Sequence, residues 1–167
     1  MDAIFEKIVL KTAFCCMASD GEIDQSEVKV IEELCENSQW LKNTEFHTEI
    51  PKLTTEFNQQ GKEFIKSYFQ ELEKYTFSEK QNLIIIDIAL QVILADEKVE
   101  YSEVKFFKNI RNRLKIDNGT IEEAFKHIPD IDTFVESDII NNLESITAEY
   151  LDNIVLPTIN IEDIKMG

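Results

Sequence analysis

Apolar residues recur at intervals of three and four along most of this chain, the spacing that places them on one face of an α-helix. The first such stretch covers residues 4–17 and stops at Gly21, which can take the left-handed conformation that ends helices. A second amphipathic helix follows it closely. Its predicted buried residues are Val28, Ile31, Leu34 and Cys35.

Residues 37–75 are less regular, and they predict two more helices with breaks near Pro51 and Gly61. The stretch 79–94 differs because it is apolar nearly all round. A helix of that kind is expected at the centre of a fold.

Three predicted helix starts carry a capping-box pattern, in which a cap residue and the residue three positions later satisfy each other's backbone amides. The pairs are Asp24 with Glu27, Ser78 with Gln81, and Thr120 with Glu123. The helix from Thr120 is expected to stop at Pro129, and another is expected over residues 135–151. The tail after it, residues 154–161, is predicted to be extended, and either to pack back on the domain or to dock on a partner.

A stretch of the chain is repeated. Residues 96–105 align without gaps onto residues 20–29, an offset of 96 minus 20, or 76 residues, and the letters Ser-Glu-Val-Lys repeat outright. Each copy consists of an apolar helix, a short acidic turn and an amphipathic helix, a unit that cannot bury its apolar face alone and is expected to pack against its copy.

We therefore predict an all-α fold: a single-domain helical bundle with an internal pseudo-twofold repeat of helix-turn-helix units. The helical core is expected over residues 1–118, with the repeats at about 1–36 and 78–116. Residues 119–167 are expected to form a C-terminal helical extension and tail.

The repeat also suggests an ion pair. Lys11 aligns with Asp87, and both lie among apolar neighbours. Asp87 shares one helix face with Gln91, four residues on. Because a lone buried charge is costly, we expect Lys11 and Asp87 to meet as a partly buried pair near the pseudo-twofold axis.

Composition and charge agree with a helical fold and limit the partners. Apolar residues make up 43% of the chain, and there are only 4 Gly and 3 Pro. The net charge of -16 repels phosphate backbones and anionic lipid. The longest apolar run, residues 83–95, is too short for a membrane span. We expect no nucleic-acid binding and no direct membrane insertion. The partners expected from this charge are metal cations or a protein with a basic surface. The alternative is that the acidic surface only maintains solubility.

The remaining reactive residues argue against catalysis. Cys15, Cys16 and Cys35 have no metal-ligand spacing, which is typical of reduced, buried thiols in a cytoplasmic protein, and the N-terminus lacks the basic opening of a secretory signal. His47 and His127 have no partners at zinc-ligand spacing and are expected at the surface or at helix ends. The sequence has no phosphate-binding loop, nucleophile elbow or zincin motif, so we expect no enzyme activity.

Two acidic turns carry the candidate chemistry. The carboxylates of the first turn are Asp20, Glu22, Asp24 and Glu27. Carboxylates this dense around a turn are ligands that Ca²⁺ and Mg²⁺ prefer. The turn is not an EF-hand loop, because Gln25 stands where that loop needs glycine and Ile31 where it needs glutamate. The same carboxylates can instead serve only to cap helices and to interact with the helix dipole.

The acidic turns carry a family resemblance. Met17-Ala18-Ser19-Asp20-Gly21-Glu22-Ile23-Asp24, followed by Ser26-Glu27, resembles the signature of the bacterial TerB-like domains associated with tellurite resistance. Leu94-Ala95-Asp96 through Glu103 resembles the repeat of that signature in the second half of the same domain. The resemblance covers about residues 1–116. It implies an all-helical bundle with a pseudo-twofold, and a non-enzymatic module of stress or phage-defence systems that chelates metal and scaffolds complexes at the inner membrane face.

The resemblance also implies a set of metal ligands. Carried over position by position, they are Asp20, Asp24, Glu27, Asp96, Glu100 and Glu103. The second copy departs from the signature, because Glu97 replaces the expected glycine and Lys98 places a positive charge inside the turn. A cation beside the ligands competes electrostatically with a metal ion and weakens that copy.

The leading hypothesis is a cytoplasmic TerB-like binding module of a bacterial stress-response or tellurite-resistance system, whose acidic turns coordinate a divalent cation, calcium or magnesium, or a basic partner patch. One alternative is an acidic inhibitor or immunity-type protein that occludes a basic active site on its partner. Another is an enzyme that uses paired carboxylates, which would have to converge in a pocket.

Overall fold

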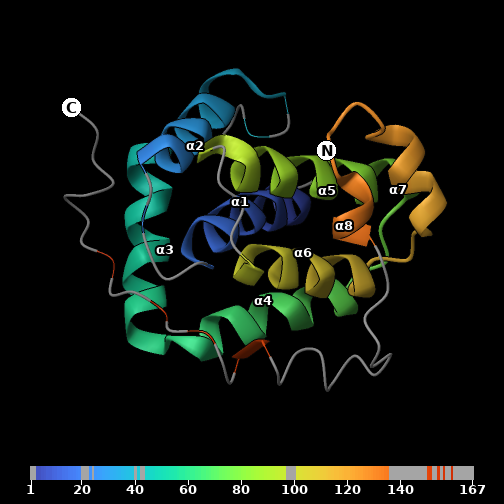
Figure 1. The fold of residues 1–167 in the computed structure, drawn as a ribbon. Helices are drawn as coiled ribbons and strands as arrows, with labels where there is room; N and C mark the ends of the chain where they lie inside the picture. Colours follow the sequence, from blue (N-terminus) through green and yellow to red (C-terminus); the bar gives the residue numbers. More distant parts are fainter. Residues whose placement is uncertain are drawn as a thin grey trace.

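The structure, a computed structural model, describes residues 3–19, 23, 25–39, 41, 44–96, 101–135, 150–151, 154, 156 and 159. These residues form helices and their connections and contain no strand, which confirms the predicted all-α class (Figure 1). The helices are α1 (Ala3–Ala18), α2 (Gln25–Asn37), α3 (Phe46–Gln60), α4 (Lys62–Lys74), α5 (Glu79–Ile93), the 3-10 turn η1 (Leu94–Asp96), α6 (Tyr101–Arg113), α7 (Asn118–Ala124) and α8 (Ile131–Val135).

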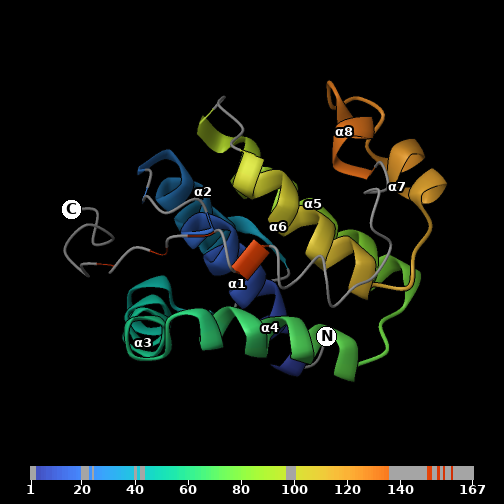
Figure 2. The ribbon, with the colours of Figure 1, turned by 60° about the horizontal axis from the view of Figure 1, so that its bottom comes forward.

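Helix α1 is the centre of the molecule. It contacts α2, α3, α4, α5 and α6, and its most extensive contact is with α5 (Figures 1 and 2). The four successive residues Phe14, Cys15, Cys16 and Met17 are all buried. Because 3.6 residues make one turn, four buried neighbours mean that this part of α1 is enclosed on every side. Helices α7 and α8 lie at the opposite end of the bundle from α3.

Helix α3 continues through Pro51, so the predicted break near that residue is wrong. The buried residues of this helix are Phe46, Ile50, Leu53, Thr54 and Phe57. A proline inside a helix costs about 3 kcal/mol. Burying four large apolar side chains at about 1.5–3 kcal/mol each outweighs that cost. The break predicted near Gly61 is confirmed: this residue separates α3 from α4 with a φ of 58° and a ψ of -127°.

The start of α5 confirms the predicted capping box. The amide of Gln81 donates to Ser78 Oγ at 3.1 Å, and the amide of Ser78 donates to Gln81 Oε1 at 3.0 Å. The box predicted at Asp24 and Glu27 includes Asp24, which lies outside the described residues.

The capping box predicted at Thr120 and Glu123 is wrong. The cap of α7 is Asp117, which accepts hydrogen bonds from Thr120 N at 2.8 Å and Thr120 Oγ1 at 3.1 Å. The helix therefore begins earlier than predicted, and it ends at Ala124, before Pro129. Glu123 forms an exposed ion pair with Lys126 instead.

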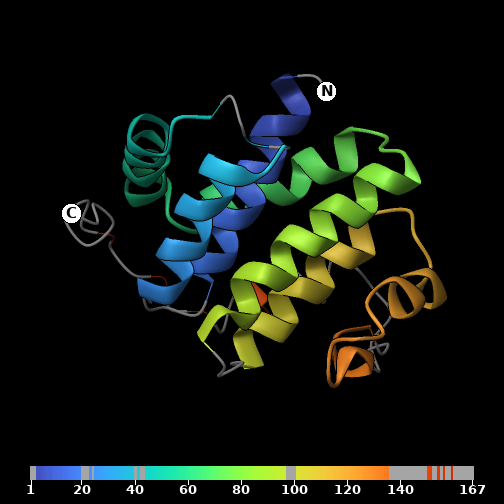
Figure 3. The ribbon, with the colours of Figure 1, turned by 90° about the horizontal axis from the view of Figure 1, so that it is seen from above.

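The bounds of the helices agree with the 76-residue offset of the repeat. Helices α1 and α5 begin at Ala3 and Glu79, and α2 and α6 are each 13 residues long and begin at Gln25 and Tyr101. The two apolar helices pack against each other (Figure 3). The twofold rotation that would relate the two units stays a prediction.

The predicted ion pair between Lys11 and Asp87 is wrong. Lys11 Nζ lies 2.8 Å from Glu71 Oε1 of α4. Asp87 Oδ2 accepts a hydrogen bond from Gln91 Nε2 at 2.9 Å. The two charged residues therefore serve different interfaces: Lys11 faces α4, whereas Asp87 lies in a groove that α5 forms with α2.

The described residues of the C-terminal tail pack back on the bundle. Tyr150 is 2% exposed, its ring lies 5.7 Å from that of Phe106, and its hydroxyl donates to the carbonyl of Ser19 at 3.4 Å. Ile154 and Ile159 are also buried. Most of the helix predicted over 135–151 lies outside the described residues.

Candidate functional site

The six predicted metal ligands are described to different extents. Asp20, Asp24 and Glu100 lie outside the described residues, and only the backbone of Asp96, the last residue of η1, is described. Glu27 and Glu103 are described in full. Glu27 and Glu103 are therefore the two predicted ligands whose side chains can be placed in the fold.

Glu27 and Glu103 occupy matching places in the fold. Glu27 is the third residue of α2, and Glu103 is the third residue of α6. Both are 0% exposed, although glutamate is among the residues that are least often fully buried. A carboxylate in the first turn of a helix interacts favourably with the positive end of the helix dipole.

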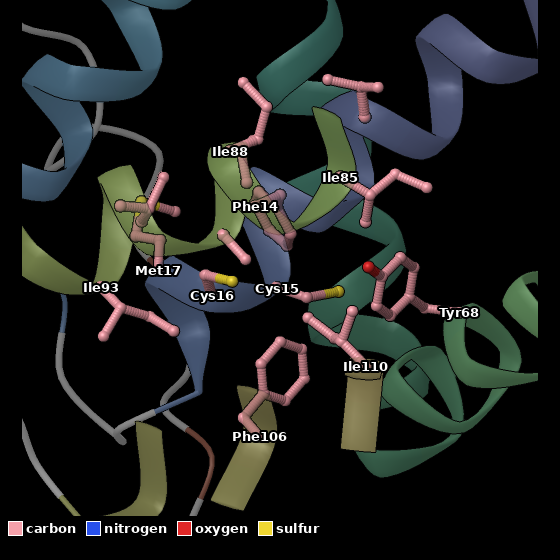
Figure 4. Packing of buried hydrophobic residues seen from close by; sticks show 14 of the residues in the cluster. Phe14, Cys15, Cys16, Met17, Tyr68, Ile85, Ile88, Ile93, Phe106 and Ile110 are labelled. Carbon is pink, nitrogen blue, oxygen red and sulfur yellow. The ribbon is translucent and has the colours of Figure 1, made fainter. Parts of the chain in front are cut away.

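The two carboxylates also influence the same side chain of the core. Burial raises the pKa of the Cys16 thiol well above its ordinary value, and the electrostatic influence of Cys15, Glu27 and Glu103 adds to that rise. Two glutamates that are 76 residues apart are therefore near enough to influence the same side chain of α1. Cys16 itself is buried in the hydrophobic core, part of which Figure 4 shows.

The chemistry of this pair fits a hard divalent cation. Calcium and magnesium prefer carboxylate oxygens, and here two helices each bring one carboxylate to a common region. Within the part of the chain that the structure describes, no group of three or more His, Cys, Asp or Glu side chains could hold a metal. The remaining donors of such a site would have to come from Asp20, Asp24, Asp96 or Glu100.

The three cysteines are free and buried, as predicted. Burial raises the pKa of all three thiols; for Cys35 it rises to about 12, with Glu32 and Glu36 adding to the effect. Thiols with such values stay protonated at neutral pH, and a thiol is a far weaker nucleophile than a thiolate. His47 and His127 are both exposed, which confirms their predicted place at the surface.

Two features of the structure were not predicted from the sequence. One is the groove between α2 and α5. The spacing of Asp87 and Gln91 indicated that they share a face, but no local signal identifies the helix opposite them. The other is Asn58, whose side chain binds the main chain of Ile159. The sequence around Asn58 predicts an exposed position in a helix, and no local pattern indicates a hydrogen-bond partner 101 residues away.

Comparison with known protein families agrees with this architecture. A family model described as "Tellurite resistance protein TerB" matches residues 9–126. The match covers more than half of the chain and both acidic turns, and it runs through the end of α7. The chain therefore belongs to the TerB family. Neither the curated proteins nor the solved structures contain a match. None of the described helices is long and apolar enough to cross a membrane.

Proposed function

We propose that this chain is a non-enzymatic binding module of a tellurite-resistance type system, and that its two acidic turns coordinate one divalent cation between them. The observation that carries the proposal is the burial of Glu27 and Glu103 at equivalent places beside Cys16. Two carboxylates in one low-dielectric region repel each other, and a cation that binds both offsets that repulsion.

The two turns are expected to contribute unequally. The first turn contains Gly21 and two aspartates. In the second turn, Glu97 occupies the position of Gly21, and Lys98 occupies the position of Glu22. The positive charge of Lys98 competes with the ion. Asp20→Asn should therefore weaken binding more than Asp96→Asn.

Calorimetric titration of the full chain with calcium, magnesium, manganese and zinc tests the proposal. We expect saturable binding of one ion that Glu27→Gln and Glu103→Gln each weaken by about tenfold or more, the effect of losing one charged ligand. Glu122→Gln, an exposed carboxylate on α7, is the matched control and should bind like the parent chain. If no ion binds, or if all three variants bind alike, the acidic turns only cap helices.

Family membership supports a proposal for the cellular setting. We propose a cytoplasmic role in stress response, tested by the tellurite tolerance of bacteria that express the chain. Cells with the parent chain should tolerate more tellurite than cells with the Glu27→Gln, Glu103→Gln double variant at equal protein level. Equal tellurite tolerance of the two strains would mean that the role of the chain in the cell does not depend on these two glutamates.

A further inference from the structure

A groove of about 470 Å³ lies between α2 and α5. Its apolar residues are Val30, Leu34 and Ile88, and its polar residues include Glu33, Asp87 and Gln91. Leu34 and Ile88 are buried, whereas Glu33 and Gln91 are exposed, so the groove has an apolar floor and a polar rim. Its volume falls in the range of sites that hold small ligands or single side chains.

The rim is acidic. Among the described residues that line the groove, two are carboxylates and none is basic. Gln91 Nε2 donates to Asp87 Oδ2 at 2.9 Å, and no described residue donates to Asp87 Oδ1. His127, on the segment after α7, lies near enough to Asp87 to influence its carboxyl group.

The environment of Asp87 leaves its charge poorly solvated. Burial raises the pKa of the Asp87 carboxyl, and the hydrogen bond from Gln91 and the charge of His127 only partly oppose that rise. A partly buried carboxylate gains more from a cationic partner than an exposed one, because it has already lost some of its water.

We propose that this groove binds a lysine or arginine side chain presented by a basic segment of a partner protein. The methylene stem of that side chain lies along Val30, Leu34 and Ile88, and its charged head binds Asp87 Oδ1. Long basic side chains commonly bury their stems and keep the head among polar groups. Glu33, on the exposed rim, interacts with the next basic residue of the segment.

A protein segment fits better than a free amine for two reasons. The net charge of -16 attracts an extended basic segment over a longer range than a single amine. Glu33 and Asp87 lie on different helices at the rim, so they can bind two cationic groups of one ligand. This proposal gives a place to the basic partner expected from the sequence, and it does not rest on metal binding.

Fluorescence anisotropy with two labelled peptides tests the proposal on the full chain. One is a short lysine-alanine repeat, and the other replaces each lysine by diaminobutyrate, whose stem is two methylenes shorter; both are measured at a pH where the amines of both peptides are protonated. A general attraction to the acidic surface binds both peptides equally. The groove should bind the lysine peptide at least tenfold more tightly, because only its stems reach the apolar floor.

Variants of equal charge locate the site. Asp87→Asn should weaken the lysine peptide about tenfold, the effect of one charged hydrogen bond, and Glu33→Gln about threefold. Glu122→Gln removes the same charge from α7 and should leave the affinity unchanged apart from a small, salt-sensitive part. Circular-dichroism melts check that each variant is folded.

Three outcomes would overturn the proposal. Equal binding of the two peptides, or equal weakening by Asp87→Asn and Glu122→Gln, would mean that only the overall field attracts them. Competition by cadaverine or agmatine as strong as that of the peptide would assign the groove to a free amine. A loss of binding confined to Asp87→Asn and Glu33→Gln, together with dependence on stem length, would support it.

Discussion

Asn58 on α3 holds the main chain of Ile159 at two points. Its Nδ2 donates to the carbonyl oxygen of Ile159 at 2.7 Å, and its Oδ1 accepts from the amide of Ile159 at 2.9 Å. The side chain of Ile159 is 2% exposed and packs in the core. The amide of Asn58 therefore satisfies both polar groups of the Ile159 main chain and holds this part of the tail on the bundle. Asn58 lies within residues 9–126, which the TerB family model matches, whereas Ile159 lies outside them.

Asn58→Leu is expected to release the tail. Each of the two hydrogen bonds contributes about 0.5–1.5 kcal/mol, so the free energy of unfolding should fall by about 1–3 kcal/mol. Hydrogen exchange at the Ile159 amide should accelerate. Asn58→Asp keeps the acceptor for the Ile159 amide but places a carboxylate oxygen opposite the Ile159 carbonyl oxygen, so it should release the tail at least as strongly. Gln59→Leu, on the neighbouring exposed position, is the control, and unchanged protection of Ile159 in Asn58→Leu would contradict the expectation.

The ion pair of Lys11 and Glu71 should contribute measurably to stability. Their side chains are 23% and 33% exposed, and Lys11 Nζ also lies 5.8 Å from the ring centroid of Phe64. A double-mutant cycle with Lys11→Met and Glu71→Gln should give a coupling energy of about 1 kcal/mol. The same cycle on Lys126 and Glu123, which are 74% and 76% exposed, should give a value near zero. Equal couplings would show that partial burial adds nothing here.

Gly61→Ala should destabilise the fold through backbone strain alone. A φ of 58° with a ψ of -127° is accessible to glycine but not to residues with a Cβ, and a Cβ built at this position meets no atom within 4 Å. We expect a loss of about 1–3 kcal/mol in urea unfolding, with no change in the slope of the transition. Gln60→Ala, one residue earlier and exposed, should be nearly neutral. A neutral Gly61→Ala would mean that the joint between α3 and α4 can adopt another conformation.

The buried thiols should make the protein sensitive to alkali. In the unfolded chain a cysteine loses its proton near pH 8.5, whereas burial raises the pKa of Cys35 to about 12. The stabilising contribution of the thiol is therefore complete below about pH 8.5 and is lost as the pH rises toward 12. Urea unfolding at several values between pH 7 and 11 should give a steeper decline for the parent chain than for Cys35→Ala. If the free energy of unfolding declines equally with pH in both proteins, the Cys35 thiol does not cause the sensitivity to alkali.

The local parts of the fold could be predicted from the sequence. Helices α1, α2 and α5 were predicted closely, because apolar spacing and the cap at Ser78 act within a few residues. The start of α7 was not, because Asp117 competes with Thr120 for the role of cap, and the aspartate carboxylate accepts from both the amide and the hydroxyl of Thr120. Choosing between two cap residues requires the geometry of the chain before the helix.

Contacts between helices were harder to predict. The alignment of Lys11 with Asp87 gives equivalent positions, but equivalent residues meet only if both face the axis that relates them. Lys11 faces α4 instead. For the candidate site, the sequence indicated Glu27 and Glu103 through the family resemblance, but their complete burial and their common neighbour Cys16 depend on the packing of three helices.

The enclosure of α1 has a consequence for how the protein is made. Its most extensive partner, α5, begins at Glu79, 79 minus 3, or 76 residues, after the start of α1. A ribosome that adds about 5–20 residues per second leaves the apolar α1 without that partner for several seconds. During this interval the nascent chain exposes surface that chaperones recognise, so folding yield in the cell should depend on how quickly synthesis reaches the end of α5.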